Sequence, residues 1–167
     1  NFSFQNTIYS HGWSELLPFE IDSEKWRLSY VFDDKSFRKP IFTTISANEK
    51  SIKIEFGENK IDANAKRIIK EKVKHILRLD EDFSEFYKLT KRNKDFRWIE
   101  KMHIGRLMRS PTVFEDLVKT ICTTNCSWAA TDKMVNALVN ELGVEAQGGG
   151  RTFPTPEAMA SVDENFY

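Results

Sequence analysis

The chain has 167 residues, 40% of them hydrophobic and 13% aromatic, and its 25 basic residues balance its 25 acidic ones. This composition indicates a packed globular protein with one domain or two small ones, and it excludes a disordered chain. No apolar run approaches the ~18 residues that a membrane span requires, and no signal-peptide pattern is present, so we predict a cytoplasmic protein without membrane contact.

Alternation of apolar and polar residues, which is typical of half-buried strands, dominates the first third of the chain. It predicts strands over residues 2–9, 26–32, 41–46 and 52–56, with one helical turn over 16–19. Turn residues separate these segments, so we expect an antiparallel sheet of about four strands.

From residue 61 the hydrophobic period becomes helical. The pattern predicts helices over residues 65–77, 83–89, 96–108, 111–122, 134–142 and 156–159. Because strands come first and helices follow, we expect an α+β architecture with segregated layers. We divide the chain into a sheet domain with a packed helix, residues 1–79, and a helical part, residues 80–167.

The segment from residue 103 to 128 is the most informative. Ser110 and Pro111 resemble a helix start, with a capping hydroxyl before a proline at the first helical position. One apolar helical face follows, formed by Val113, Phe114, Leu117, Val118, Ile121 and Cys122. A polar elbow that contains Asn125 interrupts this pattern, and Gly143 ends the next helix.

Charge is unevenly distributed along the chain. Residues 61–110 carry 14 basic and 8 acidic residues, a net charge of +6, whereas residues 111–167 carry 3 basic and 8 acidic ones, a net charge of −5. A basic middle segment with interleaved aromatic residues fits either a phosphate-binding surface or a solvated helix face. The acidic last segment argues against a protein that coats nucleic acid with its whole surface.

Neither a metal site nor a cofactor is predicted. Cys122 and Cys126 are the only cysteines, and we interpret them as packed thiols in a reducing compartment. The three histidines are too scattered to complete a zinc site, and standard nucleotide-binding and hydrolase motifs are absent from the sequence. We interpret Glu115 and Asp116 as acidic residues that interact favourably with the N-terminus of a helix, and not as catalytic acids.

Residues 104–160 resemble the helix-hairpin-helix DNA glycosylase superfamily, with 8-oxoguanine and type II 3-methyladenine glycosylases as the nearest subgroups. The family's run of proline, hydrophobic residue, glutamate, leucine and a final small polar elbow matches Pro111, Phe114, Glu115, Leu117, Val118, Ile121, Cys122, Thr123, Thr124 and Asn125. A second family segment matches Phe153, Pro154, Thr155, Met159 and Ala160. The resemblance implies a TATA-binding-protein-like sheet domain followed by part of an all-helical glycosylase domain.

The resemblance also implies base-excision repair, in which a damaged purine is flipped out of duplex DNA and its N-glycosidic bond is hydrolysed. It makes Asn125, Cys126 and Ser127 the candidates for the DNA-binding wedge. His11 and Gly12 are the candidates for the lesion pocket; alternatively, Gly12 only makes a turn that Trp13 anchors. The expected partner is damaged double-stranded DNA, bound by a nucleoid-associated monomer.

The family's phosphate-gripping hairpin and its catalytic aspartate have no counterpart among these residues. We therefore predict no catalytic residue within the chain, expect it to be part of a longer protein, and expect it to be inactive alone. The alternative interpretation is a non-catalytic DNA-binding or protein-interaction domain. Cys126, Ser127 and Ala130 replace the residues that read the opposite cytosine in the 8-oxoguanine enzymes, so the lesion preference stays open.

Overall fold

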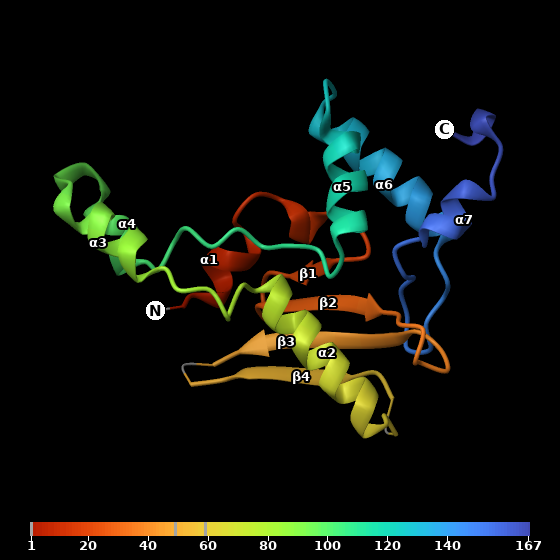
Figure 1. Ribbon diagram of the computed structural model, residues 1–167, viewed down its shortest axis with the longest axis horizontal. Coiled ribbons are helices and arrows are strands. Elements are labelled where there is room, and N and C mark those ends of the chain that lie inside the picture. The colour runs from red at the N-terminus through yellow and green to blue at the C-terminus, as the bar shows by residue number, and fades with distance from the viewer. Residues whose placement is uncertain (1, 49, 59) are drawn as a thin grey trace.

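The computed structural model describes residues 2–48, 50–58 and 60–167, and it confirms the predicted α+β class. Four antiparallel strands form one sheet in the order β1 (Glu20–Asp22), β2 (Arg27–Phe32), β3 (Ile41–Ala47) and β4 (Ile52–Phe56) (Figure 1). The chain therefore runs through the sheet as a simple meander, and all but the first two short helices follow the sheet in sequence.

The helix α2 (Ala63–Ile76) lies across the sheet, as Figure 1 shows, and builds the first hydrophobic core with it. Asp62 caps α2 by accepting a hydrogen bond from the Ala65 amide at 2.9 Å. The alternating residues Leu28, Tyr30 and Phe32 of β2 enter this core together with Ile69, Val73 and Ile76 of α2. The apolar residues that the alternating and the helical pattern place on one face are therefore buried in this core.

Residues 2–9 were predicted to form a strand, and this prediction is wrong. They contain the helix α1 (Phe4–Ile8), which begins because Ser3 Oγ accepts a hydrogen bond from the Asn6 amide at 3.3 Å. Phe4 and Ile8 lie four residues apart, so one helical face carries both into the first core. The short strand β1 takes the expected place in the sheet, and the helical turn expected over 16–19 occurs earlier, as the 3-10 helix η1 (Trp13–Glu15).

The helices α3 (Ser84–Arg92) and α4 (Arg97–Lys101), joined by the 3-10 helix η2 (Lys94–Phe96), project away from the sheet (Figure 1). The helix predicted over 96–108 thus ends at Lys101, because the following segment runs back along the body in an extended form. There Met108 enters the first core, and the Arg109 amide donates to the Ile76 carbonyl at 3.0 Å.

The remaining helices are α5 (Val113–Thr123), α6 (Trp128–Leu142), α7 (Pro156–Ala160) and the 3-10 helix η3 (Glu164–Phe166). The expected start of α5 at Ser110 and Pro111 is two residues too early. Thr112 caps this helix instead, accepting a hydrogen bond from the Glu115 amide at 3.2 Å. The end of α6 at Gly143 and the start of α7 at Thr155 and Pro156 are confirmed.

Helix α5 has one broad apolar face, and only half of it is covered. Phe114, Val118 and Cys122 pack on the second hydrophobic core, whose buried members are Leu16, Val135, Val139 and Phe153. In contrast, Val113, Leu117 and Ile121 are 80%, 55% and 62% exposed. The face turned toward the sheet is polar, because it carries the buried residues Glu115 and Lys119.

Candidate nucleic-acid interface

The elbow between α5 and α6 lies at one extremity of the molecule, where the two helices meet (Figure 1). Thr124 ends α5 in an extended conformation, and Asn125 follows with a positive φ of 55°. Asparagine is one of the few residues that adopt this left-handed conformation readily. The Asn125 side chain is exposed, and it makes no hydrogen bond to another residue that the structure describes.

The two residues after Asn125 hold the elbow closed. The Cys126 thiol donates to the Cys122 carbonyl at 2.8 Å, and the Thr131 hydroxyl donates to the same carbonyl at 2.9 Å. Ser127 caps α6, its hydroxyl accepting from the Ala130 amide at 3.3 Å. The geometry therefore gives Cys126 and Ser127 a local structural task and leaves the Asn125 amide free to meet a ligand.

Gly12, in the turn that also carries His11, lies against the Trp128 side chain, although 116 residues separate the two in sequence. Gly12 has a φ of 89°, and a Cβ atom at this position would lie 2.7 Å from Trp128 Cη2 and Cζ2. Trp128 is the first residue of α6 and directly follows Ser127. The structure thus connects the Gly12 turn to Trp128, the residue that follows the predicted wedge and that the sequence did not single out.

His11 is exposed and lies beside Trp13. The two rings stack at a centroid distance of 4.7 Å, and His11 Nδ1 lies 2.9 Å from the Ser10 hydroxyl. Burial lowers the pKa of His11 below its ordinary value of 6.5; Asp116 opposes this shift, and Lys119 adds to it. His11 is therefore a neutral ring at neutral pH and can stack or accept a hydrogen bond without carrying a charge.

Acidification should destabilise the protein through His11. Because the pKa of His11 is lower in the folded chain than in the unfolded one, protons bind the unfolded chain more tightly. The contribution is present above pH 6.5 and is lost as the pH falls toward the lowered pKa. When the pH is lowered from about 7.5 to about 5, the free energy of unfolding measured in urea should fall less for His11→Gln than for the unmodified chain. Equal losses would contradict this assignment.

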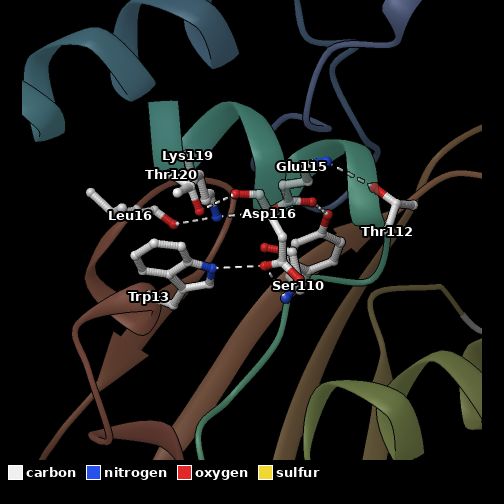
Figure 2. Close-up of polar contacts among 9 residues, drawn as sticks. Trp13, Leu16, Ser110, Thr112, Glu115, Asp116, Lys119 and Thr120 are labelled. Carbon is white, nitrogen blue, oxygen red and sulfur yellow. Dashed lines mark hydrogen bonds and ion pairs between the residues drawn. The ribbon is translucent and has the colours of Figure 1, made fainter. Parts of the chain in front are cut away.

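A buried polar cluster connects α5, the helix that leads to the elbow, to the sheet. The Tyr30 hydroxyl of β2 donates to Glu115 Oε2 at 2.6 Å, and Lys119 Nζ lies 2.7 Å from Glu115 Oε1. Lys119 Nζ also reaches the Leu16 carbonyl at 3.4 Å (Figure 2). Burial lowers the pKa of Lys119, with Glu115 opposing the shift, and burial together with the Glu115 charge raises the pKa of Tyr30.

Asp116 makes a second connection from the same turn of α5. Its Oδ1 accepts hydrogen bonds from Trp13 Nε1 at 2.8 Å and from the Ser110 amide at 2.9 Å, as Figure 2 shows. Glu115 and Asp116 do lie in the first turn of α5, as their interpretation as N-terminal charges requires. That interpretation missed their main contacts, which are long-range. The only available sequence signal was the four-residue spacing from Glu115 to Lys119.

The basic middle segment is spread over α2, α3 and α4, and part of its charge is neutralised locally. Lys72 pairs with Asp34, Lys74 with Glu71 and Lys88 with Glu85. Exposed aromatic residues, Phe96 and Trp98, accompany the basic residues of α4. None of the helices in the described residues combines the length and hydrophobicity needed to cross a lipid bilayer.

The sequence matches none of the known protein-family models and none of the curated protein sequences. Two solved structures resemble the chain closely in fold. A 3-methyladenine DNA glycosylase from Archaeoglobus fulgidus matches 95% of this chain and 55% of its own, with a TM-score of 0.74 and 18% identity. An 8-oxoguanine glycosylase/lyase from Clostridium acetobutylicum matches 99% of this chain and 53% of its own, with a TM-score of 0.68 and 17% identity.

The chain spans about half the length of these two structures, so the likeness concerns this portion and not their complete architecture. It covers the sheet, α2 and the paired helices around the elbow, because nearly every residue of the chain takes part in the match. The chain therefore shares the fold of the matched half of these two DNA glycosylases, in agreement with the fold that the sequence resemblance predicts.

Proposed function

We propose that this chain is the sheet domain and the wedge-bearing part of a base-excision-repair DNA glycosylase that removes a damaged purine from duplex DNA. The observation that carries the proposal is the fold match over 95% to 99% of the chain with two DNA glycosylases. The exposed, left-handed Asn125 at the tip of two packed helices supports it independently. A short amide at such a tip can enter a base stack and hydrogen-bond an orphaned base.

In this proposal the elbow enters the duplex, and Asn125 fills the space that the flipped nucleotide leaves. The turn of His11 and Gly12 contacts the extruded base, and the neutral His11 ring offers it a stacking surface. Trp128 already occupies the side of Gly12 where a Cβ atom would stand. A base that approaches Gly12 from that side must therefore stack on the indole or displace it.

Excision chemistry belongs, in this proposal, to residues outside this chain, because the family's catalytic aspartate has no counterpart here. The 167-residue chain should bind duplex DNA weakly, with an affinity that falls steeply as salt is raised, and should release no base. A protein that contains this chain together with the missing part should release 8-oxoguanine or 3-methyladenine from a lesion duplex. Absence of any duplex affinity at low salt would overturn the proposal.

Asn125→Ala is the variant that tests the wedge. In the complete protein we expect base release to fall about 10- to 100-fold, because the vacated space in the stack is no longer filled. The measurement is single-turnover excision from duplexes that carry one lesion. Asn140→Ala, an exposed asparagine on α6, is the matched control and should excise normally. Normal excision by Asn125→Ala would remove the wedge role.

The alternative, a non-catalytic DNA-binding or protein-interaction domain, is favoured by one observation. The exposed face of α5 formed by Val113, Leu117 and Ile121 is more apolar than a solvated helix needs. Duplex binding by the chain with no base release by the complete protein, across a panel of oxidised and alkylated purines, would support this alternative.

A further inference from the structure

Helix α5 is joined to the sheet by the hydrogen bond from Tyr30 to Glu115, and the buried ion pair of Glu115 with Lys119 lies within the helix itself. Tyr30, Glu115 and Lys119 are 4%, 1% and 0% exposed, and together they fill the contact between β2 and α5. The face of α5 that is turned to solvent carries Val113, Leu117 and Ile121 and has no partner within the described residues. No packing from that side therefore clamps the helix.

The polar contact is directional in a way that apolar packing is not. One oxygen of the Glu115 carboxylate accepts from Tyr30, the other from Lys119, so the carboxylate is held from two sides. Lys119 in turn lies over the Phe19 ring at 4.7 Å and near the Phe153 ring at 5.8 Å. Hydrogen bonds of this kind lose strength steeply with angle, so they resist tilting of the helix.

The elbow lies at the far end of a lever that starts at this contact. Ten residues separate Glu115 from Asn125, which corresponds to ~15 Å along a helix, so a tilt of ~5° at Glu115 moves the elbow by ~1 Å. A displacement of that size in a functional group is enough to cost catalysis heavily. Asp116 adds a second attachment in the same turn through Trp13 and Ser110.

We propose that Tyr30, Glu115 and Lys119 form a joint that fixes the direction of α5 relative to the sheet and thereby positions the elbow. Glu115 and Lys119 are positioning residues for Asn125 and touch no substrate themselves. The fixed direction of α5 is a property of this chain alone, whereas its use on DNA rests on the proposed function.

The joint can be tested without DNA by measuring the distance between two spin labels. One label is placed at Ile121→Cys, on the exposed face of α5 near the elbow, and the other at Lys53→Cys, on β4. The two native thiols are removed by Cys122→Ala and Cys126→Ser. Pulsed electron–electron resonance should give a narrow distance distribution for this chain.

Removal of the joint should broaden that distance distribution by about 1 Å or more, because α5 loses its support on the sheet. The variant is the apolar triple substitution Tyr30→Phe, Glu115→Leu and Lys119→Met, which leaves no buried charge unpaired and so is expected to fold. Val73→Ala, in the core beneath α2, is the matched control, since it lowers stability but leaves the joint intact. A triple variant as narrow as the unmodified chain would overturn the proposal, and so would equal broadening by Val73→Ala.

A DNA measurement then tests the use of the joint. In duplexes with 2-aminopurine beside a lesion, the triple variant should give a smaller fluorescence rise on binding than the unmodified chain, at unchanged affinity for undamaged duplex. If the unmodified chain gives no rise, the proposed function fails while the distance measurement still decides the joint. A full rise from a triple variant with a broadened distribution would show that entry of the elbow into DNA does not depend on the joint.

Discussion

Lys119→Met is expected to lower the free energy of unfolding by about 3–5 kcal/mol, the largest stability loss that the structure predicts. The lysine ammonium is completely buried and is the only cation within hydrogen-bonding distance of Glu115 in the described residues. Without it, the Glu115 carboxylate must stay charged in a dry site or take up a proton. Either outcome raises the free energy of the folded state and leaves that of the unfolded state unchanged.

Urea unfolding of Lys119→Met and of the apolar triple variant distinguishes the cost of an unpaired buried charge from the cost of a lost contact. The triple variant should be more stable than Lys119→Met, because no ionised group remains unpaired. Lys88→Met is the matched control: it breaks an ion pair of the same 2.7 Å length on an exposed surface, and it should cost less than about 1 kcal/mol. A Lys119→Met chain as stable as Lys88→Met would contradict the buried ion pair.

Gly12→Ala is expected to lower the free energy of unfolding by about 2–4 kcal/mol, from two causes that add. The backbone at Gly12 has a φ of 89°, which an L-residue adopts only with strain, and the new Cβ would overlap the Trp128 ring. The loss is measured as the change in urea midpoint, and the elbow should loosen with it because Trp128 begins α6.

Two further variants separate the causes. Gly149→Ala introduces the same kind of backbone strain at a φ of 111°, but no atom lies within 4 Å of its Cβ, so it should cost only about 1–2 kcal/mol. Trp128→Ala combined with Gly12→Ala should recover the overlap part of the loss. If Gly12→Ala and Gly149→Ala destabilise equally, the Gly12 turn does not press on α6 as the structure indicates.

Helix α5 shows most clearly where the sequence was informative and where it was not. Its apolar residues form an arc of about half the helix surface, and the pattern correctly predicts a helix here. The same pattern cannot say which half of the arc is covered, because cover depends on what other segments supply. In the structure α6 and Phe153 cover Phe114 and Val118, whereas Val113 and Leu117 face solvent.

Short segments were the least predictable. Residues 2–9 fit a strand by alternation, yet Ser3 and the four-residue spacing of Phe4 and Ile8 suit a helix as well. The sheet decided between them, since Glu20–Asp22 pairs with β2 and leaves no place there for the first residues. Similarly, the helix expected to reach residue 108 stops at Lys101, because burial of Met108 draws the chain back to the core.

The sequence by itself determined the α+β class, the strands β2 to β4 followed by helices, the elbow with Asn125 and the resemblance to DNA glycosylases, because all of these follow from local periodicity and motif spacing. Only the tertiary structure decided that the Gly12 turn meets Trp128 and that Tyr30, Glu115 and Lys119 share one buried site. The contacts of Tyr30 with Glu115 and of Gly12 with Trp128 join residues 85 and 116 positions apart, and no local pattern carries information about such partners. The long-range packing of the chain therefore determines how the elbow is held, while the local sequence determines that an elbow exists.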